Sequence, residues 1–327
     1  MDYKEKYSEY LAKIENRITT SIPNLEPNQL YDPFRYIMKE GGKRLRPILT
    51  MICAGLVGGN PDDAIDSAVA IEVLHNFTLV HDDIMDNSPI RRGRQTIHEK
   101  WDSPTAILTG DVMIGYAYKL LPRSTVHKNS DKILSVFTNE LIEVCEGQVL
   151  DMVFNEKKDV EIDDYINMID KKTARLIETS SVIGALIGNG SDLEIQSIRK
   201  ISHNIGLAFQ IQDDLLDMTA KQEDFGKKIG KDIIEGKKTF LVLKAKEIIK
   251  SNDDRSLLLR FIENNGLNEA EVPLMNELFL RNGIYEIAQN EIDRYFDEAF
   301  SLFTNLKNNY YSEMLKWLLN SLNKRLL

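Results

Sequence analysis

Residues 68–86 read AVAIEVLHNFTLVHDDIMD, an apolar run that ends in Asp82-Asp83-Ile84-Met85-Asp86. The pattern recurs at residues 201–217, where ISHNIGLAFQIQDDLLD ends in Asp213-Asp214-Leu215-Leu216-Asp217. Both runs have helical periodicity, and helices this apolar normally lie inside a bundle. Each D-D-x-x-D cluster is therefore predicted at the C-terminal end of a buried helix, opening into a cavity rather than onto bulk solvent.

The aspartates of each cluster are spaced to share a helix face. Asp82 and Asp86 are four residues apart, as are Asp213 and Asp217, so each pair projects together. Clustered carboxylates repel one another unless hard cations such as Mg²⁺ sit between them and a phosphorylated ligand. Two such clusters on facing helices would clamp a diphosphate through several metal ions.

A cationic segment follows each acidic cluster. Residues 87–102 carry three arginines, and residues 219–238 carry six lysines and three glycines. Arginine and lysine bind the phosphate oxygens that a metal does not hold. The second segment is expected to order over bound substrate, because its glycines permit movement and its lysines need an anion.

Composition favours a single all-α domain spanning residues 1–327. The chain is 43% hydrophobic and has nine prolines, and strand-like alternation is scarce. Helical periodicity predicts helices at 3–19, 28–39, 44–57, 62–86, 104–121, 131–154, 162–188, 192–218, 237–250, 253–264, 272–282, 284–303 and 308–324.

Charge and cysteine usage narrow the function classes. The net charge is −10 without an extended basic run, which argues against nucleic acid as a partner. No uncharged apolar run is long enough to span a membrane, and the first residues lack the apolar core of a secretory signal. The two cysteines, Cys53 and Cys145, lie in apolar helical patterns and suggest no disulfide, so a cytoplasmic location is expected.

These residues resemble the trans-type isoprenyl diphosphate synthases, also called polyprenyl synthetases. The family motifs appear in order as GGKRLRP at 41–47, LVHDDIMD at 79–86, RRG at 91–93, KKT at 171–173, FQIQDDLLD at 209–217 and GKKIGKD with GKKT across 226–239. The resemblance implies an isoprenoid-synthase-type bundle of about a dozen helices around a deep central cavity. It also implies a homodimer.

The resemblance implies a reaction as well. An allylic diphosphate ionises, the double bond of isopentenyl diphosphate attacks the allylic cation, and a proton is lost. The site then needs Mg²⁺, three ions in each active site with Mn²⁺ as a substitute, to stabilise the leaving diphosphate. Asp82, Asp86 and Asp213 are the expected ligands, with Asp83, Asp214 and Asp217 in weaker or supporting roles.

The remaining site residues are assigned by the same resemblance. Those expected to bind isopentenyl diphosphate are Lys43, Arg46, His75 and Arg92. Those expected near the allylic diphosphate or the cation are Arg91, Lys172, Thr173, Gln210, Lys227 and Lys237. Lys171 is an alternative to Lys172, and Lys238 to Lys237, because each lysine is doubled.

One position departs from the family pattern. The family has proline after RRG-x, where this chain has Gln95. Proline would stiffen the loop, so its rigidity is in question, although the diphosphate contacts are not.

Product length is expected to depend on the residues one turn before the first cluster. Phe77 and Thr78 precede Asp82 by five and four residues, and five helical residues advance about 7.5 Å. Phe77 would floor the cavity at limited depth. An aromatic residue followed by a small one resembles archaeal-type geranylgeranyl diphosphate synthases, with farnesyl diphosphate as the alternative product.

Other classes fit the motifs less well. A non-catalytic prenyltransferase subunit typically loses its acidic motifs, and both are intact here. A class I terpene cyclase usually has a different second metal motif and lacks GGKRLRP and RRG. An HD-type phosphohydrolase is suggested only by His81-Asp82, and the chain has five histidines in all.

Overall fold

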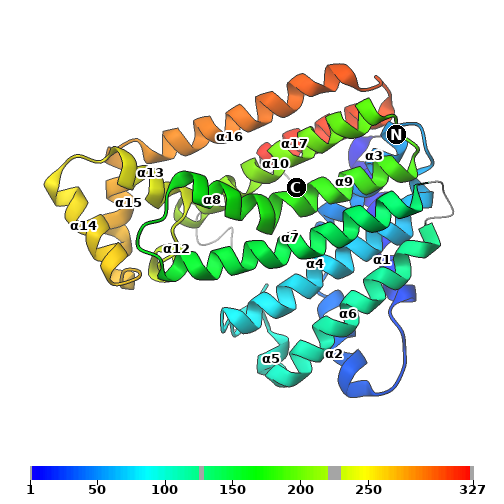
Figure 1. Cartoon of the computed structure of the whole chain (residues 1–327), viewed down its shortest axis with the longest axis horizontal. Coiled ribbons are helices and arrows are strands. Elements are labelled where there is room, and N and C mark those ends of the chain that lie inside the picture. The colour runs from blue at the N-terminus through cyan, green and yellow to red at the C-terminus, as the bar shows by residue number, and fades with distance from the viewer. Residues whose placement is uncertain (1, 125–128, 220–229, 325–327) are drawn as a thin grey trace. The chain divides into compact units, whose positions relative to one another are not determined.

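The computed structural model describes residues 2–124, 129–219 and 230–324, and these residues are almost entirely helical (Figure 1). The α-helices are α1 (Tyr3–Ser21), α2 (Asn28–Met38), α3 (Leu45–Leu56), α4 (Ile65–Met85), α5 (Ile97–Lys100), α6 (Ser103–Ser124), α7 (Ser130–Glu156), α8 (Ile162–Ile169), α9 (Arg175–Ile187), α10 (Asp192–Thr219), α12 (Lys231–Ile234), α13 (Phe240–Ile248), α14 (Asn252–Glu263), α15 (Val272–Arg281), α16 (Ile284–Ser301) and α17 (Tyr310–Asn323). The predicted all-α fold is confirmed.

Short elements complete the described part of the chain. The 3₁₀ turns are η1 (Pro61–Ala64), η3 (Glu269–Glu271) and η4 (Leu302–Asn305), and η2 (Asp170–Ala174) is a π-helical turn. Strands β1 (Ile90–Arg91) and β2 (Arg94–Gln95) pair antiparallel, with Ile90 opposite Gln95. Periodicity missed this hairpin because two residues are too few to show alternation.

Two compact units make up the chain. The first comprises Met1–Ile142, Leu176–Ser202 and Phe300–Leu327, and the second comprises Glu143–Arg175 and His203–Ala299. The boundaries fall within α7, α9, α10 and α16, so neither unit is one continuous stretch.

The first unit is built around α4. This helix packs most extensively along α6 and also against α3 and α1 (Figure 1). Most residues from Ser67 to Phe77 are buried, as expected for an apolar run that packs on several neighbours. Gly184 on α9 lets that helix approach α3 closely, because a Cβ there would lie 2.1 Å from the Thr50 carbonyl oxygen.

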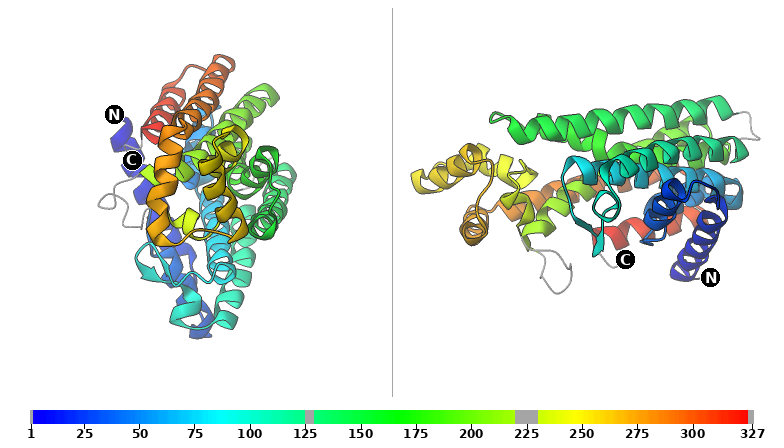
Figure 2. Two further views of the ribbon diagram at one scale, coloured as in Figure 1. Left: turned by 90° about the vertical axis from the view of Figure 1, so that its left-hand side faces the viewer. Right: turned by 90° about the horizontal axis from the view of Figure 1, so that it is seen from below.

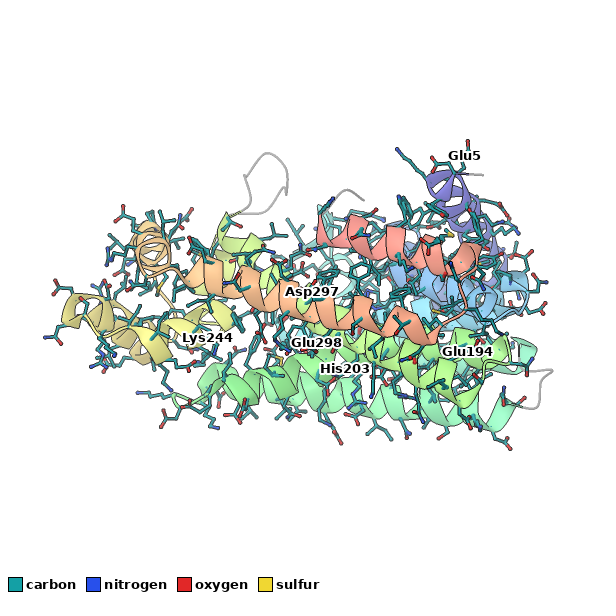
Figure 3. All side chains as sticks on the ribbon, turned by 90° about the horizontal axis from the view of Figure 1, so that it is seen from above. Glu5, Glu194, His203, Lys244, Asp297 and Glu298 are labelled. Atoms are coloured by element: carbon teal, nitrogen blue, oxygen red, sulfur yellow. The ribbon has the colours of Figure 1, made fainter. Side chains whose placement is uncertain are left out.

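The second unit contains the C-terminal part of α10 and the helices that follow it. Helices α14 and α15 lie side by side (Figure 2), and Arg281 of α15 forms an ion pair with Asp254 of α14. Helix α16 lies along α10, where Asn204 donates to Glu298 over 3.4 Å. Figure 3 labels Glu298 on α16 and His203 on α10, next to Asn204 in sequence.

The helix predicted at 162–188 is interrupted. It divides into α8, the π-helical turn η2 and α9, and the interruption holds the KKT motif. A π-turn adds one residue to a helical turn and is often found at functional sites, but periodicity alone does not reveal it.

No helix among residues 2–124, 129–219 and 230–324 is long and apolar enough to cross a membrane. Cys53 is buried and Cys145 is exposed.

Candidate active site

The three aspartates of the first acidic motif, at the end of α4, differ in exposure and in hydrogen-bond partners. Asp82 is half-buried and Asp86, the C-cap residue, is exposed. Asp83 is buried and accepts a hydrogen bond from Arg91 Nε at 2.8 Å. Burial raises the pKa of the Asp83 carboxyl, although Arg91 opposes the shift. Asp82 and Asp86 are therefore the more accessible carboxylates, while Asp83 anchors Arg91.

The predicted isopentenyl diphosphate residues come together in the first unit. Arg46 Nη1 lies 3.4 Å from His75 Nε2, which joins the GGKRLRP loop to α4. Arg92 Nη1 donates to the Gly41 carbonyl at 3.0 Å, which joins the β-hairpin to the same loop. The Lys43 carbonyl accepts from Tyr7 Oη at 2.5 Å, and the Lys43 residue is exposed. Three separate segments thus place Lys43, Arg46, His75 and Arg92 around one loop.

The pKa of His75 is lowered by its surroundings in this cluster. Its pKa lies well below the ordinary value, first because of burial and then because of the positive charges of Arg46, Arg92, Arg91 and Arg44. A neutral imidazole accepts the Arg46 hydrogen bond without adding to the repulsion. The Arg46 guanidinium beside a neutral histidine is an arrangement that suits binding of an anion.

This low pKa predicts a pH-dependent loss of stability. As the pH falls through the ordinary histidine value of 6.5, the unfolded chain takes up a proton at His75 that the folded chain does not. The free energy of unfolding should therefore fall, by up to about 1.4 kcal/mol per pH unit. Urea denaturation between pH 7.5 and pH 5.5 should show a shallower fall in His75→Gln than in the parent chain. Equal slopes in the two proteins would contradict the low pKa.

The π-turn η2 lies in the second unit and holds the KKT motif. It lies between two glycines, Gly147 of α7 and Gly206 of α10. A Cβ at Gly147 would lie 2.5 Å from the Lys172 backbone nitrogen, and one at Gly206 would lie 2.5 Å from Ala174 Cα. Any larger residue would push the turn outwards, so both glycines are required for this close approach.

A hydrogen-bonded chain connects η2 to the second acidic motif. Thr173 Oγ1 donates to Gln210 Oε1 at 2.9 Å, and Gln210 Nε2 donates to Asp214 Oδ1 at 3.2 Å. Asp214 also accepts from Tyr165 Oη at 2.6 Å and from the Phe240 backbone N–H at 3.0 Å. Burial, with the nearby Asp232 charge second, raises the pKa of Asp214 to about 7. Asp214 is thus a buried anchor for Gln210 and α13.

The other two aspartates of the second motif are less buried. Asp213 and Asp217 are both half-buried. Asp217 Oδ2 accepts from the Asp232 backbone N–H at 3.1 Å, and its carbonyl accepts from the Gly230 N–H at 2.8 Å. Asp217 therefore secures the start of α12. Its role as a metal ligand, like that of Asp213, stays a prediction.

The doubled lysines have different surroundings. Lys171 forms ion pairs with Glu143 and Glu146, each at 2.5 Å, whereas Lys172 pairs with Asp151 at 2.5 Å. Asp151 has a lower exposed fraction than either glutamate. The two lysines therefore pair with different carboxylates of α7, and the choice of Lys172 over Lys171 stays a prediction.

Lys237 and Lys238 differ in the same way. Lys238 is 8% exposed and donates to the Asn155 carbonyl and to Asn265 Oδ1. Lys237 is half-buried and lies within 3.7 Å of Asp232 and 3.4 Å of Glu235. The choice of Lys237 over Lys238 as the substrate-binding residue stays a prediction. The predicted site residue Lys227 lies outside the described residues.

The proposed chain-length residues lie on α4. Phe77 is 5% exposed, and its ring meets the His81 ring edge-on with centroids 4.7 Å apart. His81 is held in turn against α6, where its Nε2 lies 3.3 Å from the Ile107 carbonyl oxygen. Thr78 donates to the His75 carbonyl at 2.8 Å, which is a bond within its own helix. Phe77 is thus the bulkier and more firmly packed of the two.

Sequence reasoning missed two residues on α7. Asp151 holds Lys172, and the side-chain oxygen and nitrogen of Gln148 are buried without a hydrogen-bond partner in the described part of the chain. The stretch EGQVLD at 146–151 places Gln148 and Asp151 three residues apart, on one helix face. This spacing, next to Gly147, is the sequence feature that could have identified Gln148 and Asp151.

The loop that contains Gln95 lacks the family's proline, but contacts with other residues hold it. Tyr36 Oη donates to the Gln95 carbonyl at 2.9 Å. The Arg94 guanidinium lies 4.0 Å from the centroid of the Tyr36 ring, and Lys100 Nζ lies 4.2 Å from the same centroid. Cation–π contacts of this kind are attractive, and here they secure the hairpin to α2.

The donor chemistry of the acidic motifs fits a hard divalent cation. Carboxylate oxygens are the ligands that Mg²⁺ prefers, and it commonly takes one or two of them together with substrate phosphates. Across residues 2–124, 129–219 and 230–324, no three acidic, histidine or cysteine side chains form a cluster that could hold a metal ion.

Comparisons with known proteins agree on one family. The polyprenyl synthetase family model matches residues 27–278. The chain is 41% identical over 288 residues to a short chain isoprenyl diphosphate synthase of Methanothermobacter thermautotrophicus, covering 88% of this chain and 87% of that protein. It is 36% identical over 323 residues to a geranylgeranyl diphosphate synthase of Sulfolobus acidocaldarius, covering 97% of both chains.

A solved structure adds a ligand-bound relative. Polyprenyl synthase from Caulobacter crescentus, complexed with calcium and isoprenyl diphosphate, is 28% identical, with a TM-score of 0.89 over 99% of this chain and 97% of that one. Motifs, fold and relatives agree, and the chain belongs to the polyprenyl synthetase family.

Proposed function

We propose that this protein is a short-chain trans-prenyltransferase that condenses isopentenyl diphosphate with an allylic diphosphate, with geranylgeranyl diphosphate as its main product. The observation that carries the proposal is the convergence of Arg46, Arg92 and Lys43 around neutral His75, beside the helix that ends in the first acidic motif. The family membership and the geranylgeranyl diphosphate synthase among its relatives support the same reaction.

The arginine-rich loop would bind isopentenyl diphosphate. Lys43, Arg46 and Arg92 would contact its phosphate oxygens, and Arg46 is already oriented by His75. Holding the diphosphate fixes where the double bond lies, which reduces the entropy cost of the condensation.

The residues predicted near the allylic diphosphate would serve the ionising substrate. Lys172 and Lys237, with Arg91, would pair with the departing diphosphate. Thr173 and Gln210 present neutral oxygens where positive charge develops, and their mutual hydrogen bond fixes those oxygens in place. Neutral dipoles stabilise a carbocation without the basicity that would quench it.

A divalent metal would complete the charge balance. Asp82, Asp86 and Asp213 would hold it, with Asp83 and Asp217 in support, and Mg²⁺ is the expected ion, three per site, with Mn²⁺ as a substitute. When bound, it supplies positive charge to the leaving diphosphate. The Caulobacter relative is complexed with calcium and isoprenyl diphosphate, which supports the use of a divalent cation.

Product analysis tests the proposal directly. The protein is incubated with labelled isopentenyl diphosphate, Mg²⁺ and dimethylallyl, geranyl or farnesyl diphosphate in turn, and the dephosphorylated products are separated by chromatography. Geranylgeraniol is expected as the dominant alcohol. Farnesol would keep the enzyme class and change the product. No elongation by folded protein would favour a terpene cyclase or a non-catalytic subunit.

We also propose that the chain works as a homodimer through α6 and α7. Tyr118 of α6 contacts Thr138 and Phe137 of α7, so the two helices are neighbours. Large apolar side chains are exposed on both, namely Ile107, Leu108, Leu134, Ile142, Val149, Met152 and Val153. The five on α7 fall on one helix face, and apolar patches of this kind mark association surfaces.

Charged substitutions on this face are expected to separate the protomers. The double change Leu134→Glu and Ile142→Glu places two carboxylates in the proposed contact, so light scattering should report the mass of one chain rather than two. Leu259→Glu is the control, because Leu259 is 55% exposed on α14, away from α6 and α7 in sequence. A double variant that keeps the parent mass would exclude this face as the dimer contact.

The proposal treats residues 1–327 as one domain, because the boundaries between the two compact units fall within four helices. The two cysteines of the sequence, Cys53 and Cys145, suggest no disulfide framework, and the cytoplasm is the proposed location.

A further inference from the structure

Arg44 is the one residue of the KRLR sequence at 43–46 that is almost fully buried. Its side chain is 1% exposed, whereas Lys43 is exposed and Arg46 is half-buried. Its backbone is left-handed, with φ of 46° and ψ of 41°, at the N-cap of α3. This conformation is unfavourable for a residue other than glycine, so the surrounding contacts must hold it.

Three helices supply those contacts. Arg44 Nε donates to Glu15 Oε1 of α1 at 2.7 Å, and Nη1 donates to Glu72 Oε1 of α4 at 2.7 Å. Nη2 donates to the Met38 carbonyl at the end of α2, at 2.8 Å. The guanidinium therefore uses each of its three nitrogens on a different helix, and only arginine has the planar fork to do so.

The acceptor on α4 is itself fixed. Glu72 is 5% exposed, and its Oε1 also accepts from Asn76 Nδ2 at 3.2 Å. Glu72 lies three residues before His75, which contacts Arg46. One turn of α4 thus holds two arginines of the loop, with Arg44 at Glu72 and Arg46 at His75.

We propose that Arg44 is a positioning residue for the isopentenyl diphosphate site. Its buried side chain fixes the loop backbone, and the loop backbone places Lys43 and Arg46. The inference rests on the proposed function and adds to it a residue that does not itself touch substrate. The left-handed turn at Arg44 directs the neighbouring backbone, and the buried ion pairs keep that turn in place before substrate arrives. Preorganisation of this kind lowers the cost of binding.

The test separates positioning from stability. Removing Arg44 alone would leave Glu72 buried without its partner, so Arg44→Met is combined with Glu72→Met. Apolar replacement of both members of a buried pair commonly preserves stability. The expected result is a rise of about tenfold or more in KM for isopentenyl diphosphate, as for other supporting residues. KM for the allylic diphosphate should change less than about twofold, with Tm close to the parent value.

A control ion pair joins α1 and α4, the two helices whose glutamates hold Arg44. Arg17 of α1 pairs with Asp66 of α4 at 2.5 Å, but neither residue contacts the loop. The double change Arg17→Met and Asp66→Met should leave both KM values at the parent level. Arg46→Ala provides the reference for loss of a direct contact.

Each outcome decides the proposal. An unchanged KM for isopentenyl diphosphate in a folded Arg44/Glu72 variant would overturn it, and so would equal increases for both substrates. If that variant does not fold, the single change Glu15→Gln, at a partly exposed position, is measured for the same selective rise, and no rise there would overturn the proposal. Failure of the proposed function is distinct, since the parent protein would then elongate no allylic substrate.

Discussion

Replacing Asp82 by alanine is expected to lower kcat by at least about a hundredfold, as does loss of a principal electrostatic contact at other active sites. Asp82 and Asp86 are four residues apart on α4. The remaining aspartate of the motif, Asp83, is buried and accepts a hydrogen bond from Arg91. The accessible negative charge at this helix end is thus concentrated on two carboxylates. Removal of one should weaken metal binding and leave the charge of the departing diphosphate poorly compensated. Initial rates measured across a Mg²⁺ titration give the size of the loss and the shift in metal demand.

The same substitution should leave folding intact. Like charges four residues apart on a helix repel, so loss of the Asp82 carboxylate relieves its repulsion with Asp86. Tm is expected to stay close to that of the parent. Asp66→Ala is the matched control on α4, because Asp66 pairs with Arg17 and lies outside the site residues. Parent-like turnover in Asp82→Ala would remove the metal clamp from the proposal.

Asp213→Ala should reproduce this loss. Asp213 follows Gln210 by three residues on α10 and is half-buried, whereas its neighbour Asp214 is committed to Tyr165, Gln210 and Phe240. Full activity in Asp213→Ala would leave the second motif with a structural role only.

The sequence predicted the helices well because their signal is long and periodic. The apolar run at 68–80 and the run before Asp213 each extend over several turns, so the buried face is repeated enough times to be read. The GGKRLRP loop, His75 and the RRG segment were predicted through family resemblance. In the structure Arg46 contacts His75 and Arg92 contacts the Gly41 carbonyl.

Features that depend on packing could not be read from the sequence. Nothing local distinguishes Asp83 from Asp82, and Asp83 is buried because Arg91 comes from a hairpin eight residues later. The π-turn at Asp170–Ala174 depends on close approach by Gly147 and Gly206 from two other helices. Such features follow from tertiary contacts between distant residues, which periodicity does not encode.

Gln95 illustrates compensation between distant positions. Proline would restrict the loop through its own ring. Here Tyr36 and Arg94 restrict it through a hydrogen bond and a cation–π contact. The motif shows that the proline is missing, but it does not show that Tyr36 of α2 restrains the loop instead.

Phe77→Ala is expected to shift the product to chains longer than that of the parent. Phe77 lies five residues before Asp82, or about 7.5 Å along the helix, and its ring is fixed edge-on against His81. If this ring ends the space available to the growing chain, its removal should permit at least one further condensation. The dephosphorylated products, separated by chromatography at several ratios of isopentenyl to allylic diphosphate, give the length distribution.

Loss of a buried aromatic ring also costs about 3–5 kcal/mol of stability, so the product change must be separated from loosened packing. Phe279→Ala removes an equally buried ring, which packs on Tyr285 in the other compact unit, and it should reduce stability while leaving product length unchanged. Phe77→Leu should give an intermediate distribution, because leucine fills part of the vacated volume. If Phe77→Ala stays folded and makes only the parent product, Phe77 is a core residue and the limit on chain length lies elsewhere. If length instead increases in the order Phe, Leu, Ala while the Phe279 variant stays at the parent length, the volume at position 77 sets the product.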